Sequence, residues 1–144
     1  MEEIENKYIV TKLNKTITLF FEKLSEWEES VARKVNLTPR QCHAISEIGE
    51  CGPARMKPIS ERLGVTTGTM TIMADRLDRL KMVKRQTDTN DKRASLLTLS
   101  DKGKAVYEEH TLHHLRLSHE FVTALGEEDA ELLIKLIDKM NDVL

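Results

Sequence analysis

Four histidines fall within one short segment, EEHTLHHLRLSHEF, which is predicted to be helical: His110, His113, His114 and His119. His110 and His114 are four residues apart and therefore share one face of that helix. His43 belongs to an earlier predicted helix that we expect to pack nearby. Two imidazoles at this spacing, with a third from another element, form a ligand set that suits Zn²⁺. The alternative is that these histidines are structural, hydrogen-bonded side chains at an interface.

The second group with chemical potential is a basic segment, residues 52–93. It holds ten Lys and Arg against five Asp and Glu, a balance of +5, which leaves −7 for the rest of a chain whose net charge is −2. A nearly neutral protein with one basic block is suited to a local contact with a polyanion such as DNA. A solvated face with scattered charge is the alternative. We favour DNA because the block coincides with the helix-turn-helix pattern described next.

The segment LTPRQ, residues 37–41, marks the start of a helix. Thr38 can cap the helix, Pro39 suits its first position, and Gln41 completes a capping box. Gly and Pro at 52–53 are a stop signal, so this helix is expected to end near Cys51.

Two further helices are predicted around a tight turn. The first spans about residues 56–63, and Gly64 can adopt the left-handed conformation that follows a helix. Thr66 or Thr67 caps the second helix, which runs to about Leu80. Its expected core face consists of Met70, Met73, Ala74 and Leu77.

The first turns of this second helix are the candidate readers of a major groove. They contain no Arg or Lys, so they offer no bidentate contact to guanine, whereas Thr side chains and Ile72 can touch thymine methyls and phosphates. We therefore predict an A·T-rich operator. The candidate DNA-contacting residues are Thr66, Thr67, Gly68, Thr69, Thr71, Ile72, Arg76, Lys92 and Arg93.

A β-wing is predicted from two short β-compatible runs, residues 82–86 and 94–98, with the turn-forming sequence TDTNDKR between them. Lys92 and Arg93 then lie near the tip, where they can meet phosphates or a narrow minor groove. Asp91 is expected to structure the wing by an ion pair with Arg93. A merely soluble loop is the alternative.

Long helices flank the winged helix-turn-helix region, residues 37–99. One is predicted over about residues 3–34, another over about 100–124 with Ser100 as its cap, and a last amphipathic helix follows the break at Gly126. Their apolar stripes exceed what one small core can cover, so residues 1–36 and 100–144 are expected to form a dimerisation region. Ordinary amphipathic helices within one subunit are the alternative.

The chain of 144 residues suits one domain with a dimerising extension, mostly α-helical with a small β-wing. No apolar run approaches the roughly 20 residues that span a bilayer. The acidic start, MEEIENKY, predicts no secretory signal, and Cys42 and Cys51 are placed as small buried thiols, so we expect a cytoplasmic protein. The sequence contains no HExxH motif, no nucleophile with paired carboxylates and no glycine-rich phosphate loop, so it does not predict an enzyme.

The patterns ISERLGVTTGTMTIMADRL, MVKR and DTNDKRASLLTLSDKGKAV resemble the MarR family of bacterial transcriptional regulators over essentially the whole chain. The Asp-x-Arg of the wing and LTLSDKG are the most specific parts. The resemblance implies an obligate-type homodimer with one winged helix-turn-helix per subunit. It also implies binding to a pseudo-palindromic DNA operator, usually as a repressor relieved by a ligand. One departure is Lys81, where many members have glycine, so the turn before the wing is expected to differ slightly.

Two branches of that family are similar to this chain in different segments. VTTGTMT is similar to the branch that represses fatty-acid synthesis and is thought to sense acyl chains on acyl carrier protein. His43, His110 and His114 match the histidines of the zinc-sensing branch, which adds a first-helix carboxylate, here Glu22 or Glu26. Glu109 and Cys42 could add a second metal site. The effector is thus left open between a small molecule, acyl carrier protein and a metal ion, and a winged-helix protein-interaction module without DNA binding is the alternative function.

Overall fold

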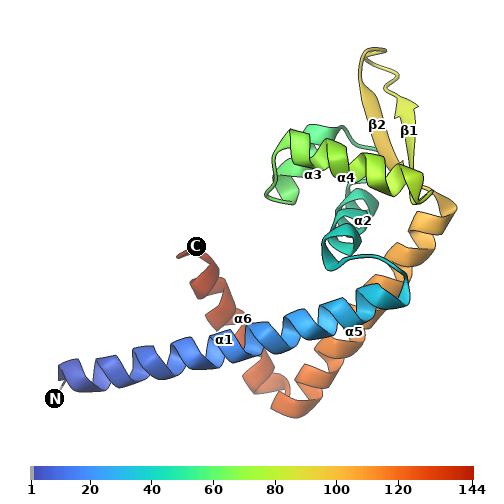
Figure 1. The fold of residues 1–144 in the computed structure, drawn as a ribbon. Coiled ribbons are helices and arrows are strands. Elements are labelled where there is room, and N and C mark those ends of the chain that lie inside the picture. Colours follow the sequence, from blue (N-terminus) through green and yellow to red (C-terminus); the bar gives the residue numbers. More distant parts are fainter. Residues whose placement is uncertain (1) are drawn as a thin grey trace.

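The structure is a computed structural model that describes residues 2–144, with side chains from residue 6 onward (Figure 1). A winged-helix unit, residues 37–99, lies at one end, and a long first helix and a long fifth helix cross beneath it. The expected fold, mostly α with a small β-wing, is confirmed. In chain order the elements are α1 (Glu2–Lys34), α2 (Pro39–Cys51), α3 (Met56–Arg62), α4 (Thr67–Arg79), β1 (Val83–Thr87), β2 (Ser95–Leu99), α5 (Asp101–Leu125) and α6 (Glu127–Asn141).

The start of α2 follows the predicted capping box. The Gln41 backbone N–H donates to Thr38 Oγ1 at 3.2 Å, and the Thr38 N–H donates to Gln41 Oε1 at 2.9 Å. Pro39 occupies the first turn, where no backbone donor is needed. Gly52 ends the helix with a φ of +64°.

The turn between α3 and α4 is also confirmed. Gly64 has a φ of +64°, which is inexpensive only for glycine. Thr66, rather than Thr67, caps α4: its Oγ1 accepts the N–H of Thr69 at 3.1 Å. This cap fixes where α4 begins and therefore which side chains face outward.

The hydrophobic core lies mainly in the winged-helix unit, and Ala32 at the end of α1 and Val106 of α5 complete it. All four predicted core residues of α4 are buried there. Fully burying a side chain the size of leucine or isoleucine contributes roughly 1.5–3 kcal/mol, so this cluster dominates the stability of the unit. Its largest fully buried members are Ile45, Ile48, Ile59, Met70, Leu77, Leu97 and Cys42.

The wing is a two-stranded antiparallel sheet in which Val83 pairs with Leu99 and Thr87 with Ser95. Each strand begins one residue later than predicted. Ala54, in the loop between α2 and α3, adds an isolated bridge to Leu97 of β2, which ties that loop to the wing.

The first turn of α5 is fastened to the turn between α4 and β1. Ser100 Oγ donates to the Lys81 carbonyl at 2.6 Å and accepts the Gly103 N–H at 3.0 Å. A Cβ at Gly103 would lie 1.9 Å from the Met82 carbonyl oxygen, so only glycine fits. Lys81 has a φ of +62°, so this turn takes the left-handed conformation that glycine favours, although the residue is lysine.

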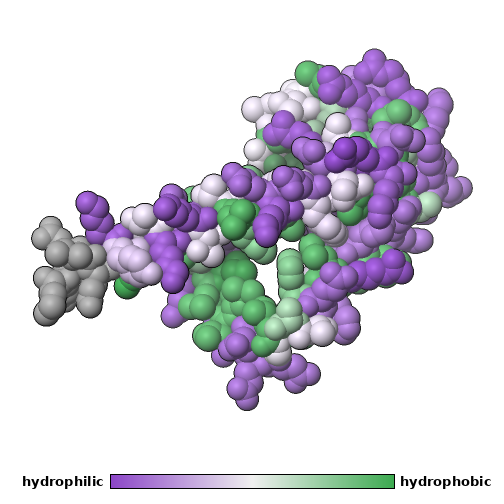
Figure 2. Space-filling view, turned by 60° about the horizontal axis from the view of Figure 1, so that its bottom comes forward, coloured by the Kyte–Doolittle hydropathy of each residue, from purple (hydrophilic) through white to green (hydrophobic). Residues whose placement is uncertain are grey.

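We call residues 2–30 and 112–144 the helical arms. In the part of the arms whose side chains are described, no residue is buried, and α6 has no buried residue along its length. Figure 2 shows hydrophobic side chains gathered below α1, on the side of α6. The exposed apolar side chains of α6 include Leu132, Leu133, Ile134, Leu136, Ile137 and Met140. No helix within residues 2–144 is long and apolar enough to cross a membrane.

Candidate nucleic-acid interface and histidine cluster

The outward face of α4 presents methyl groups more than hydrogen-bond donors. Ile72 lies at the centre of this face and is 57% exposed. The Thr71 hydroxyl donates to the Thr67 carbonyl at 2.9 Å, and Thr66 and Thr69 share a hydroxyl contact of 2.9 Å. Three threonine hydroxyls are therefore engaged within the helix. Of the predicted reading residues, Thr66, Thr67, Gly68, Thr71, Ile72 and Arg76 are exposed and Thr69 is half-buried.

A shallow hollow of about 130 Å³ lies between the start of α2 and the outer face of α4. Ile72 and Arg76 line it from α4, and Arg40 lines it from α2. The sequence analysis did not select Arg40. The sequence does place Arg40 in the first turn of α2. Only the fold, however, brings that turn next to the outward face of α4.

The wing places Lys92 and Arg93 on exposed backbone at its turn. Asp91 structures this turn, but not through the predicted ion pair. Its Oδ1 accepts the backbone N–H of Arg93 at 3.1 Å, and its Oδ2 lies 3.7 Å from Nη2 of Arg55. The prediction of an Asp91–Arg93 side-chain pair is wrong because the carboxylate faces the loop of Arg55, which leaves the Arg93 guanidinium outside this network.

Several cations of the basic segment are already neutralised within the protein. Arg62 pairs with Glu47 and Glu50 of α2, Arg85 of β1 pairs with Asp75 of α4, and Lys57 lies 3.9 Å from Glu61. Arg55 pairs with Asp88. Among the described side chains, the cations of residues 52–93 outside such pairs are Arg76, Arg79, Lys81, Lys84, Lys92 and Arg93. The charge offered to a polyanion therefore lies on the second half of α4 and on the wing.

A histidine cluster lies where α1, α2 and α5 meet. The Nε2 atoms of His110 and His114 are 3.2 Å apart, and the His43 and His110 ring centroids are 6.1 Å apart. Ser46 Oγ lies 3.2 Å from His110 Nδ1. A neutral His110 can satisfy both contacts, because one ring nitrogen donates while the other accepts. The three histidines therefore lie close together, and their use as metal ligands stays a prediction.

Burial and neighbouring imidazoles control the titration of this cluster. Burial, with the nearby His114 and His43 adding to it, lowers the pKa of His110 to about 4. Burial also lowers the pKa of His114, against an opposing effect of Glu28. Both imidazoles are therefore neutral near pH 7, the form that binds metal ions.

The carboxylate nearest the cluster is Glu28, not Glu22 or Glu26. Glu28 Oε1 lies 3.3 Å from His43 Nε2, because the turn of α1 beside α2 brings this residue inward. No group of three or more His, Cys, Asp or Glu side chains in the described part of the chain is arranged to hold a metal ion. His43 would therefore have to turn toward His110 and His114 to complete a site.

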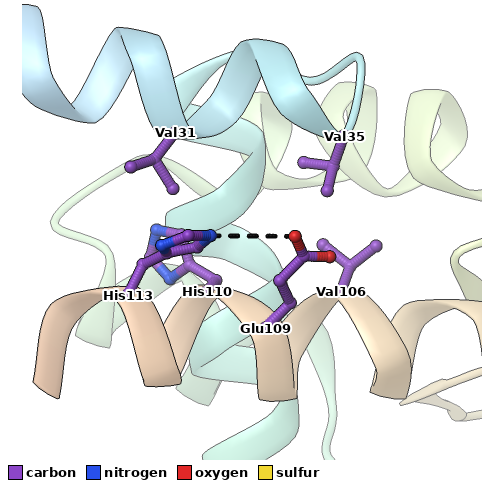
Figure 3. A pocket seen from close by; sticks show the side chains of 6 residues that line it. All are labelled: Val31, Val35, Val106, Glu109, His110 and His113. Carbon is purple, nitrogen blue, oxygen red and sulfur yellow. Dashed lines mark ion pairs between the residues drawn. The ribbon is translucent and has the colours of Figure 1, made fainter. Parts of the chain in front are cut away.

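Cys42 and Glu109, the residues suggested for a second metal site, have different surroundings. Burial raises the pKa of the Cys42 thiol to about 11, which disfavours the thiolate form that binds metal ions. Glu109 instead faces His113 at 3.7 Å. Figure 3 shows this pair on α5, pointing into the narrow space lined by Val31 and Val35 beside α1.

Comparison with known proteins adds to this geometry. Residues 37–95 match the model of the MarR family. The HTH-type transcriptional repressor MdtR of Bacillus subtilis is 25% identical over 84% of this chain and 78% of its own length. A crystal structure of Streptococcus pneumoniae FabT in complex with DNA has a TM-score of 0.87, 23% identity, and coverage of 92% of this chain and 95% of that chain. A mutant MarR from E. coli has a TM-score of 0.70 and 26% identity over 89% of this chain and 95% of that one.

Proposed function

We propose that this chain is a transcriptional regulator of the MarR family, a ligand-responsive repressor that binds a pseudo-palindromic, A·T-rich operator as a homodimer. Members of this family regulate transcription and are not enzymes. The repressor assignment follows the name of the relative MdtR. Residues 37–99 supply the DNA-binding region, and residues 1–36 and 100–144 supply the dimerisation region.

The observation that carries the proposal is the outer surface of α4 and the wing. The core face of α4 is buried, while its first turns are exposed and carry methyl groups without guanidinium or ammonium groups. Methyl groups suit the major-groove edge of thymine. The unpaired cations Arg76, Lys92 and Arg93 flank that surface and can contact phosphates or a minor groove.

The dimer is supported by the exposed apolar faces of the helical arms. α6 carries a stripe of exposed leucine, isoleucine and methionine side chains, and α1 exposes Leu13, Ile17 and Phe20. Monomeric soluble proteins rarely leave so much contiguous apolar surface in water. Two copies paired through these arms present two α4 helices, as the two half-sites of a palindrome require.

The test begins with a selection of duplexes from a random 30-base-pair library, followed by fluorescence-anisotropy titration of the selected duplex. We expect A·T-rich half-sites, and Arg93→Ala should weaken binding about tenfold across sequences and flatten the salt slope by about one for each subunit, because each subunit loses one phosphate contact. Lys57→Ala, which removes a paired cation, is the matched control. Unchanged affinity in Arg93→Ala would remove the proposed role of the wing, and no enrichment of any duplex would favour the protein-interaction module.

An acyl chain is the first candidate effector. An apolar groove of about 230 Å³ runs between α1 and α5, lined by Phe20, Lys23, Leu24, Trp27, Leu117 and Phe121. It lies within the helical arms, so an occupant could change the angle between α1 and α5. Together with the VTTGTMT segment, the groove supports control of fatty-acid synthesis. Acyl carrier protein that bears a long acyl chain should then change the affinity of this protein for the selected duplex, and the unacylated carrier should not.

Zn²⁺ is the second candidate effector. Two ligands of tetrahedral zinc with bonds of about 2.0–2.1 Å lie roughly 3.3 Å apart. His110 and His114 already have their Nε2 atoms 3.2 Å apart, and His43 is the expected third ligand. If zinc is the effector, it should change operator affinity in the wild type and have no effect after combined His110→Ala and His114→Ala substitution. A zinc response that survives in the double variant would contradict this site, and His119→Ala is the control on the same helix.

A further inference from the structure

Arg55 lies in the loop between α2 and α3, outside both α4 and the wing. The residue before it, Ala54, exchanges two backbone hydrogen bonds with Leu97 of β2: the Ala54 N–H donates at 3.1 Å and the Leu97 N–H donates back at 2.8 Å. The backbone beside Arg55 therefore acts as a short third strand of the wing sheet. This pairing directs the Arg55 side chain toward the turn that joins β1 and β2.

Two carboxylates of the wing turn receive the Arg55 guanidinium. Nε and Nη2 of Arg55 donate to Asp88 Oδ2 at 3.0 and 2.6 Å, and Nη2 lies 3.7 Å from Asp91 Oδ2. Asp88 is only 7% exposed, so its charge depends on these donors more than on water. The Asn90 N–H and Arg55 hold the pKa of Asp88 below its usual range.

The other oxygen of each carboxylate holds the backbone of the wing turn. Asp88 Oδ1 accepts the N–H of Asn90 at 2.9 Å, and Asp91 Oδ1 accepts the N–H of Arg93 at 3.1 Å. Asp88 thus connects Arg55 to the backbone at Asn90, two residues before Lys92, and Asp91 connects Arg55 to the backbone at Arg93. Lys92 and Arg93 are the two exposed cations of this turn.

We propose that Arg55 is a positioning residue for DNA binding, which holds the wing turn, residues 88–93, in the conformation that presents Lys92 and Arg93. This inference rests on the proposed function. Arg55 acts through Asp88 and Asp91, and its own charge is used within the protein. The competing role is a direct contact between Arg55 and a DNA phosphate.

The two roles predict opposite effects of removing the partner carboxylate. Asp88→Asn deletes a negative charge close to the DNA-binding surface and releases Arg55. If Arg55 contacts phosphate, or if charge alone matters, this variant should bind DNA more tightly. If Arg55 positions the wing, the same variant should bind DNA more weakly, because the turn loses its fixed conformation.

The experiment measures affinity for the library-selected duplex in Arg55→Gln, Asp88→Asn and the double variant. We expect each single substitution to weaken binding about 5- to 20-fold, and the double variant to be within about twofold of the weaker single variant, because both break one network. Lys57→Gln removes a nearby cation that lies outside this network and should change affinity less than about twofold. Unchanged or tighter binding by Asp88→Asn would overturn the inference.

Amide hydrogen exchange of the free protein gives a readout that does not depend on DNA. Arg55→Gln and Asp88→Asn should both speed exchange at the amides of Asn90 and Arg93 about tenfold or more, while exchange in α6 stays unchanged. Unchanged exchange at these two amides would overturn the inference. If the wild type bound no duplex at all, the proposed function would fail, and hydrogen exchange would still decide whether Arg55 orders the wing.

Discussion

The winged-helix unit and the helical arms treat hydrophobic side chains in opposite ways. In the unit, Ile45, Ile48, Ile59 and Leu77 are completely buried. In the arms, Leu13, Phe20 and Leu133 are each at least 40% exposed although they belong to regular helices. Helices in both regions have amphipathic sequences. The amphipathic pattern alone therefore does not tell whether the rest of the same chain covers the apolar face of a helix.

This difference separates the sources of stability. The unit closes its own core and fastens its surface with ion pairs such as Arg62 with Glu47 and Arg85 with Asp75. Between the arms and the unit, the end of α1 and the start of α5 pack on the unit through the buried side chains of Val31, Ala32 and Val106. Substitutions in the unit should therefore change the stability of a single chain, whereas substitutions in the arms should change the association between copies of the chain.

The largest effect is expected from a charge placed on the apolar stripe of α6. Leu136→Lys should disperse the homodimer, because an ammonium group in an apolar interface is costly to desolvate. Operator affinity should fall by about 1,000-fold, since two linked half-site contacts become independent. Analytical ultracentrifugation and anisotropy measure the two effects. Asp138→Asn, with the same charge change on the opposite face of α6, is the control, and a Leu136→Lys variant that remains dimeric would contradict the proposed interface.

The next effect concerns the core of the unit. Leu77→Ala should lower the free energy of unfolding by about 2–5 kcal/mol, because it leaves a cavity at a fully buried position. Leu80→Ala, at a residue that is 37% exposed near the end of the same helix, should cost less than 1 kcal/mol, by roughly the same transfer scale. Urea unfolding at several protein concentrations measures both. Equal losses in the two variants would contradict the assignment of Leu77 to the core and of Leu80 to its edge.

A smaller effect is expected at the junction of the two regions, where the folded-state pKa of His110 is about 4 against an ordinary value of 6.5. Between these values the unfolded state binds more protons, so stability is complete above about pH 6.5 and is lost as the pH falls toward 4. The loss should be on the order of 2 kcal/mol, because one pKa unit corresponds to about 1.4 kcal/mol and the site is partly hydrated. Urea titrations between pH 4 and 7 measure it. In His110→Gln this part of the pH dependence should disappear, and its persistence would assign it to other groups.

The sequence predicts elements well where local chemistry decides them. Thr38 with Gln41 fixes the start of α2, Gly64 fixes the turn, and Ser100 fixes the start of α5. These signals act within four residues and need no knowledge of the fold. The one-residue shift of both strands arises because the pairing register, which joins distant residues, sets their ends.

The candidate sites were less predictable because they depend on long-range contacts. Helical spacing placed His110 beside His114, but only packing between α1 and α2 selects Glu28 as the neighbour of His43. Similarly, no local pattern connects Arg55 with Asp88, 33 residues later in the chain. The net charge of the basic segment also overstated the available cations, because ion pairs form only in the folded chain.

The close approach at Gly103 has a mechanical consequence. Its missing side chain lets the first turn of α5 rest on the Met82 carbonyl, and Ser100 locks the same turn to Lys81. α5 and the base of the wing should therefore move together as one rigid body. In a pair of subunits joined by their arms, a small rotation of α5 would rotate α4 and the wing by the same angle. The distance between the two α4 helices would then depend on the angle at which the arms cross.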